Sequence, residues 1–245
     1  MNRIYNLRPS LPDHRDFIGY PSPVAPPAFA QLPIQPPIRD QGQEGACTGF
    51  SSTGGYEALV MPHGDNSLYS PAFTYYQARL NERSPGEDAG ASLSDVMDVA
   101  LKLGFALESE MPYVVGGYAS MPSARAESDA LAHRITSYAR CPTLADMKAA
   151  ILAGQPVILG IVVYESFETI GADGIVPIPG PTEQALGGHA ILLWAYGECA
   201  GAPGPDYATA NNSWSTRFGD NGKVYFPYAY LSNRNFTFEA WTFSV

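Results

Sequence analysis

The chain has 245 residues, of which 45% are hydrophobic and 12% aromatic, so it can bury a full core as one compact domain or as two small lobes. That composition excludes a disordered chain, and a formal net charge of −10 without any run of lysine or arginine argues against a nucleic-acid partner. The first nine residues contain no unbroken apolar stretch. We therefore expect no signal peptide and no membrane association, and a protein that is soluble, either cytoplasmic or exported by a non-classical route.

The beginning of the chain is rich in proline. Nine prolines lie between residues 1 and 37, and their fixed φ angles and missing amide protons exclude a regular helix. Apolar side chains between the prolines, such as Leu11 and Phe17, indicate that the segment packs against a surface. We expect an extended arm over residues 1–32 and a folded domain over residues 33–245. The arm could cover a cleft of that domain or be a leader that only packs beside it.

Helices are predicted in the first half of the chain. A serine followed by proline or by an apolar run is a typical helix start, because the serine hydroxyl accepts a hydrogen bond from the first turn. Glycine is a typical stop, because it adopts the left-handed conformation that ends a helix. The helices expected from these signals cover residues 47–59, 71–79, 93–103 and 143–153.

Strands are predicted in the second half. Short runs rich in β-branched and other apolar residues are typical of buried strands, and they are separated by glycine-rich turns. The expected strands cover residues 157–163, 190–196, 207–212 and 223–226. Helices followed by strands predict an α+β protein with two lobes.

Cys47 is the first candidate for chemistry. It follows Gly45 and Ala46 and starts the first predicted helix. Unpaired N–H groups and the positive end of the helix dipole lower the pKa of a thiol at such a position, which favours a nucleophile. The alternative is an inert buried cysteine, and the other cysteines, Cys141 and Cys199, are too distant in sequence to form a metal site or a disulfide framework with it.

A histidine and an asparagine follow at positions suited to assist a thiol. His189 starts an apolar strand directly after Gly188, where the absence of a side chain lets a substrate come close. Asn212 ends another strand, so its side-chain carbonyl could fix the imidazole tautomer while Trp214 shields that hydrogen bond from water. Alone, each could be a structural residue.

Together, these segments resemble the papain-like C1 family of cysteine peptidases. The family's Gln…Cys helix start matches Gln41 and Cys47, its Gly-His-Ala strand matches residues 188–190, and its Asn-Ser-Trp block matches residues 212–214. His189 lies 142 residues after Cys47, within the spacing of about 130–150 residues typical of the family.

The resemblance implies a fold, an activity and a set of site residues. The fold would be papain-like, with a helical N-terminal lobe whose central helix carries Cys47, an antiparallel β-barrel-like C-terminal lobe, and the active-site cleft between them. Cys47 would be the nucleophile, His189 the general acid/base, Asn212 its orienting group and Gln41 an oxyanion donor. Gly90, Gly188 and Trp214 would contact a peptide or protein substrate, and neither metal nor cofactor would be needed.

Departures from the family pattern indicate its bacterial and phage-type branch. Glu44 replaces the cysteine that usually precedes the nucleophile, Thr48 replaces a tryptophan, and Ser215 replaces a glycine. The predicted function is that of a cysteine endopeptidase. A transpeptidase or acyltransferase using the same residues, a catalytically silent peptide-binding module, and a peptidoglycan amidase of another Cys-His fold are the alternatives.

Overall fold

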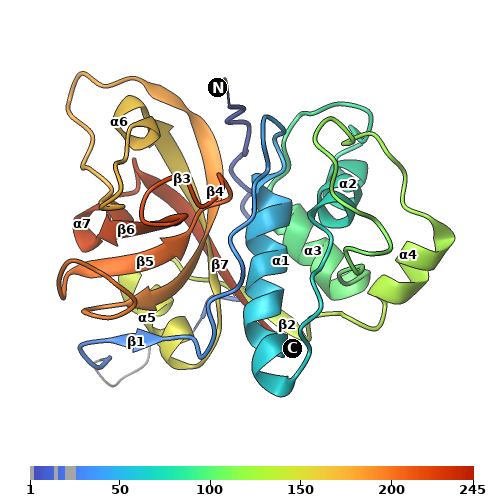
Figure 1. Ribbon diagram of the computed structural model, residues 1–245, viewed down its shortest axis with the longest axis horizontal. Coiled ribbons are helices and arrows are strands. Elements are labelled where there is room, and N and C mark those ends of the chain that lie inside the picture. The colour runs from blue at the N-terminus through green and yellow to red at the C-terminus, as the bar shows by residue number, and fades with distance from the viewer. Residues whose placement is uncertain (1–2, 14–15, 20–25) are drawn as a thin grey trace.

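The protein has two lobes with one helix between them. The structure, a computed structural model, describes residues 3–13, 16–19 and 26–245, so residues 1–2, 14–15 and 20–25 of the predicted arm lie outside the described residues. Figure 1 shows the sheet on one side, α2 (Pro71–Asn81), α3 (Leu93–Lys102) and α4 (Ala124–Ala130) on the other, and α1 (Cys47–Val60) between them. The predicted α+β class with two lobes is confirmed.

Two helices of the helical lobe have first turns that are capped as the sequence predicted. The Ser70 hydroxyl accepts a hydrogen bond from the Phe73 N–H, and the Ser92 hydroxyl accepts one from the Asp95 N–H. The short fourth helix was not predicted. The elements of this lobe are α1, the 3₁₀ turn η1 (Met61–His63), α2 (Pro71–Asn81), α3 (Leu93–Lys102) and α4 (Ala124–Ala130).

Helix α1 is buried on nearly all sides, as its mixture of small and aromatic residues predicted. All residues from Cys47 to Ala58 are buried. Small residues let neighbouring chain segments approach: a Cβ at Gly49 would lie 2.4 Å from the Pro71 carbonyl oxygen. The helix is therefore wedged between α2 on one side and the sheet on the other, with its N-terminal end at the junction of the lobes.

The second lobe is an antiparallel sheet in the order β2-β7-β3-β4-β5-β6, with β1 paired to β4. The expectation of antiparallel strands is confirmed. Within the described residues β2 and β6 are edge strands that do not pair with each other, and only isolated bridges lie on their outer sides, so the sheet is open and is not a closed barrel. The strands are β1 (Ala30–Gln31), β2 (Ser137–Arg140), β3 (Val157–Tyr164), β4 (Ala185–Tyr196), β5 (Tyr207–Asn211), β6 (Lys223–Pro227) and β7 (Thr237–Ser244), and the helices of this lobe are α5 (Leu144–Leu152), α6 (Glu165–Glu168) and α7 (Tyr228–Leu231).

Both faces of the sheet are buried, which explains the continuous apolar runs of its central strands. Successive side chains of a strand point to opposite faces. Ile158 and Leu192 accordingly belong to the core cluster that includes α1, whereas Leu159 and Ile191 belong to the cluster that includes α5. This alternation fixes the register of β4 and places His189 at the end of the sheet that meets the start of α1.

Candidate active site

Cys47 is the first residue of α1, and its sulfur lies against β4. The residue before it, Ala46, provides no side-chain cap, which leaves N–H groups of the first turn unpaired by a cap. The backbone N–H groups of Ala190, Thr48 and Cys47 instead face the thiol sulfur and favour its charged form. Because Ala190 directly follows His189, this contact brings the predicted nucleophile next to the predicted base.

The imidazole of His189 is held by Asn212 and covered by Trp214. The ring nitrogen Nε2 lies 2.8 Å from Asn212 Oδ1, and the indole ring of Trp214 lies 4.8 Å from the imidazole centroid. An amide oxygen can only accept, so Nε2 carries the proton and Nδ1 is left with the lone pair of a base. Both His189 and Asn212 are buried. The structure thus places the side chains of His189, Asn212 and Trp214 in contact.

Gln41 lies between the two lobes. Its side-chain Nε2 donates to the Glu44 carbonyl at 2.7 Å, and its Oε1 accepts from the Ser213 hydroxyl at 2.6 Å. The Gln41 backbone N–H also donates to the Ser213 carbonyl at 2.9 Å. A primary amide has two protons, so one remains for a developing oxyanion beside the N-terminus of α1. Ser213 positions the side chain of Gln41. From the sequence it was recognisable only as the middle residue of the Asn-Ser-Trp block.

The three residues expected to contact substrate instead contact the N-terminal arm. The Leu7 N–H donates to the Gly188 carbonyl at 3.2 Å, and a Cβ at Gly188 would lie 2.2 Å from the Leu7 carbonyl oxygen. A Cβ at Gly90, whose φ is +72°, would lie 2.0 Å from the Asn6 carbonyl oxygen. The Arg3 guanidinium lies 4.2 Å above the Trp214 ring. Residues 3–8 of the same chain thus lie against all three residues that were expected to contact substrate.

Burial in this covered site reverses the expected acidity of the thiol. Desolvation raises the pKa of Cys47 to about 11, although three backbone N–H groups act in the opposite direction. Desolvation also lowers the pKa of His189 to about 4, which the Arg3 charge reinforces and the Asn212 hydrogen bond opposes. The prediction of a lowered thiol pKa from the helix N-terminus is therefore wrong for this covered state, because burial outweighs the local dipoles. Both shifts favour the neutral thiol and the neutral imidazole over the ion pair.

Asp88 is a residue at the site that sequence reasoning missed. Its carboxylate accepts from the Gly45 N–H at 3.0 Å and from the Tyr75 hydroxyl, and its carbonyl accepts from the Asn6 side chain at 2.8 Å. It thereby fixes the turn that precedes Cys47 and one end of the arm. Its only sequence signal was its place two residues before Gly90.

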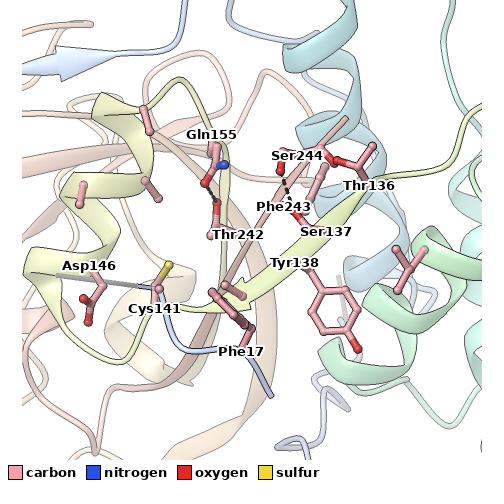
Figure 2. Close-up of a pocket in the computed structure, with 16 residues that line it drawn as sticks. Phe17, Thr136, Ser137, Tyr138, Cys141, Asp146, Gln155, Thr242, Phe243 and Ser244 are labelled. Carbon is pink, nitrogen blue, oxygen red and sulfur yellow. Dashed lines mark hydrogen bonds between the residues drawn. The ribbon is translucent and has the colours of Figure 1, made fainter. Parts of the chain in front are cut away.

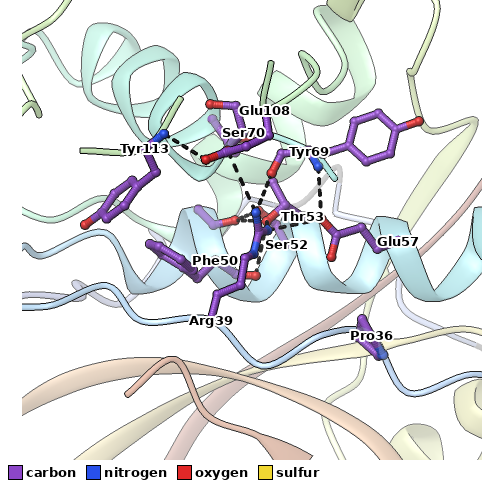
Figure 3. Close-up of polar contacts among 12 residues, drawn as sticks. Pro36, Arg39, Phe50, Ser52, Thr53, Glu57, Tyr69, Ser70, Glu108 and Tyr113 are labelled. Atoms are coloured by element: carbon purple, nitrogen blue, oxygen red, sulfur yellow. Dashed lines mark hydrogen bonds and ion pairs between the residues drawn. The ribbon is translucent and has the colours of Figure 1, made fainter. Parts of the chain in front are cut away.

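A buried polar network supports the segment that leads to Gln41. The guanidinium of Arg39 donates to the Tyr69 carbonyl at 2.9 Å and to the Thr53 hydroxyl at 2.7 Å, and it lies 3.1 Å from the Glu57 carboxylate (Figure 3). Desolvation raises the pKa of Glu57 to about 7, and the positive charge of Arg39 only partly offsets this effect. The network joins α1 to the chain that crosses between the lobes.

Other features of the described residues do not form a competing site. A separate pocket, shown in Figure 2, lies between α5, β2 and β7 and is lined by Phe17, Tyr138 and Cys141, but by none of the candidate site residues. The part of the chain that the structure describes contains no group of three potential metal ligands, and its three cysteines are free thiols. None of its helices combines the length and apolar character needed to cross a bilayer.

Comparison with known proteins identifies the class. The family model of papain family cysteine proteases matches residues 31–239, and the chain belongs to this family. It is similar to the crystal structure of xylellain, a cysteine protease from Xylella fastidiosa, with a TM-score of 0.89 and 27% identity over 98% of this chain and 96% of that one. The expected resemblance to bacterial members of the family is confirmed.

For two other relatives, the match covers a smaller share of the relative's own length. An uncharacterized peptidase C1-like protein of Acanthamoeba polyphaga mimivirus is 29% identical over 82% of this chain and 68% of its own length. Digestive cysteine proteinase 2 of Homarus americanus is 26% identical, and the match covers 77% of this chain but only 56% of the lobster protein. The chain therefore spans little more than half of that relative.

Proposed function

We propose that this protein is a cysteine endopeptidase in which Cys47, His189, Asn212 and Gln41 form the catalytic site. The observation that carries the proposal has two parts. The His189 imidazole pairs with the Asn212 side chain, and the N–H of Ala190, the residue after His189, faces the Cys47 sulfur. A thiol, a base with a fixed tautomer and a free amide proton for an oxyanion are the groups that acyl transfer requires.

The reaction follows from these positions. His189 Nδ1 removes the thiol proton as the sulfur attacks the peptide carbonyl carbon, and the oxyanion accepts hydrogen bonds from the Gln41 side chain and the Cys47 N–H. The imidazolium then protonates the amine as the C–N bond breaks and a thioester remains. Water, deprotonated by His189, cleaves the thioester, and the proton returns to the thiol. Asn212 keeps the ring in the required tautomer throughout.

Selective alkylation tests this assignment. Iodoacetamide followed by peptide mapping should show modification of Cys47 that depends on His189, and Cys47→Ala should abolish cleavage of a casein substrate without changing the circular dichroism spectrum. Cys199→Ala is the matched control, because it removes a half-buried thiol outside the site. Unchanged cleavage by Cys47→Ala would refute the proposal. Adding a primary amine and analysing the products separates hydrolysis from acyl transfer.

We also propose that residues 1–32 form a segment that covers the cleft of a peptidase domain over residues 33–245. The carbonyl oxygens of Tyr5, Asn6 and Leu7 contact Gly187, Gly90 and Gly188. Each carbonyl is therefore turned toward a glycine of the cleft wall. This orientation supports the view that the peptidase does not cleave its own covering segment. The neutral state of the thiol and imidazole under this segment also supports a resting form.

Trimming tests the covering role. Strand β1 and the buried Leu32 are part of the folded sheet lobe, so the deletion should remove only residues 1–12. We expect faster alkylation of Cys47, a lower pH midpoint for its alkylation than the value of about 11 in the covered state, and faster peptide hydrolysis. Identical alkylation and hydrolysis with and without residues 1–12 would show that the arm only packs beside the cleft.

A further inference from the structure

A hollow lies beyond the catalytic residues, where the arm continues over the start of α3. A parallel bridge pairs Arg8 with Ser92, and the Ser10 hydroxyl accepts from the Ser94 N–H at 3.0 Å. The hollow has a volume of about 880 Å³ and is lined by the arm, the end of α2, α3 from Ser94 to Lys102, and Tyr138 of β2. Arg8 lines it, so the hollow begins directly after Leu7 in the arm.

Glu82, at the end of α2, holds the Arg8 guanidinium in this hollow. The two side chains form an ion pair, and Glu82 is the more buried partner, with its side chain 12% exposed against 51% for Arg8. The other carboxylate oxygen of Glu82 accepts from the Ser92 N–H at 2.8 Å, which fixes the group in place. A carboxylate at the C-terminal end of a helix and largely removed from water is unfavourable unless a cation meets it.

The charges around Glu82 leave it dependent on the arm for that cation. Five carboxylates line the hollow, those of Asp13, Asp16, Glu82, Asp95 and Asp98, whereas its cations are Arg8 and Lys102. The ammonium of Lys102 lies 2.6 Å from Asp98. When the arm leaves, Arg8, Asp13 and Asp16 leave with it, and the carboxylates of Glu82, Asp95 and Asp98 then face one lysine.

The residue before Arg8 shows what lies next to this position. Leu7 is 4% exposed and belongs to the same buried apolar cluster as Ala91 and Leu93. The arm thus presents an aliphatic side chain to an apolar pocket and, directly adjacent, a guanidinium to a fixed carboxylate. A peptide that replaces the arm meets the same two surfaces.

We propose that Glu82 forms an acidic subsite that binds the lysine or arginine side chain of a peptide substrate, next to an apolar pocket that takes an aliphatic side chain. This inference rests on the proposed function. The preferred substrates carry a basic residue beside a leucine-like residue on the side of the cleft that α3 forms. Charge-assisted hydrogen bonds of this kind change binding by about tenfold or more.

A ratio of two substrates tests the subsite in the full chain. The peptides are acyl-Arg-Leu-Gly-aminocoumarin and its norleucine counterpart, acyl-Nle-Leu-Gly-aminocoumarin. Both compete with the same arm, so arm release cancels from the ratio of their kcat/KM values. We expect the ratio to favour arginine by about tenfold in the native protein and to fall to about one in Glu82→Gln, which keeps an acceptor for the Ser92 N–H.

Asp98→Asn is the matched control, because it removes the same charge from the same hollow at a carboxylate that has its own lysine partner. It should leave the ratio unchanged. If the kcat/KM ratio is unchanged in Glu82→Gln, or falls equally in Asp98→Asn, the subsite proposal is refuted, whereas the proposal of peptide hydrolysis is not. If neither peptide is cleaved, hydrolysis is refuted, and the protection of Cys47 from iodoacetamide by each peptide is measured instead. Stronger protection by the arginine peptide that depends on Glu82 supports the subsite. Equal protection by the two peptides refutes it.

Discussion

Truncating Leu7 tests how strongly the arm is held in the cleft. Leu7 is 4% exposed, and cutting a buried leucine back to alanine costs about 2–3 kcal/mol where the surroundings do not collapse. If this loss falls on the covered state alone, the population of the uncovered state rises by roughly 30–150-fold, since about 1.4 kcal/mol corresponds to a factor of ten. Leu7→Ala should therefore uncover Cys47.

Alkylation of Cys47 by iodoacetamide, followed by mass spectrometry, measures that population when uncovering is rare and fast compared with the chemical step. Leu11→Ala provides the matched control, because the same change is made in the same arm at a side chain that is 83% exposed. Cys141 is 2% exposed in the sheet lobe, so its modification reports global unfolding. Equal Cys47 rates in Leu7→Ala and Leu11→Ala, with Cys141 unmodified, would refute the reasoning.

Three further predictions concern the site and its support. Asn212→Ala removes the 2.8 Å contact with His189, and kcat for peptide hydrolysis should fall by about tenfold or more with little change in KM; a kcat within twofold of the native value would contradict the orienting role. Gly188→Ala places a Cβ 2.2 Å from the Leu7 carbonyl oxygen, so alkylation should become faster and peptide hydrolysis slower, and parallel changes in both assays would count against a shared groove. Burial raises the pKa of Glu57 to about 7, so this group stabilises the fold below its ordinary pKa and that contribution is lost as pH rises through 7. Relative to Glu57→Gln, the native protein should lose roughly 2–3 kcal/mol of unfolding free energy between pH 5 and 8 in urea titrations, and a pH-independent difference would show that Glu57 keeps its ordinary pKa.

Much of the fold could be read from local signals. The start of α2 follows from Ser70 and Pro71, because capping depends on neighbours in sequence. The central strands follow from apolar runs that are buried on both faces. Strand β7 was missed, since Thr237, Glu239 and Thr242 interrupt its apolar pattern, although all three are buried in the fold. Their burial depends on partners elsewhere in the chain, such as the Pro156 carbonyl that accepts from Thr242.

The contact between two of the candidate site residues was predictable, but the pKa of the candidate nucleophile was not. His189 and Asn212 were recognisable from ordered motifs, and the structure places their side chains in contact. The pKa of Cys47 was predicted in the wrong direction, because the helix N-terminus is a local feature whereas desolvation depends on everything packed around the sulfur. Glu82 had no signal, since its partner Arg8 lies in a different part of the chain and only the folded structure brings them together.

The attachment of the covering segment to the sheet through β1 has a consequence for control. A tethered ligand binds its site at an effective concentration set by the linker, on the order of millimolar for a short flexible one. Occupancy of the cleft should therefore be the same at any dilution of the intact protein. A single cut between the cleft-bound residues and β1 makes the peptide an ordinary ligand that diffuses away. Release would then be irreversible at cellular concentrations and reversible only if the cut peptide were added back in large excess.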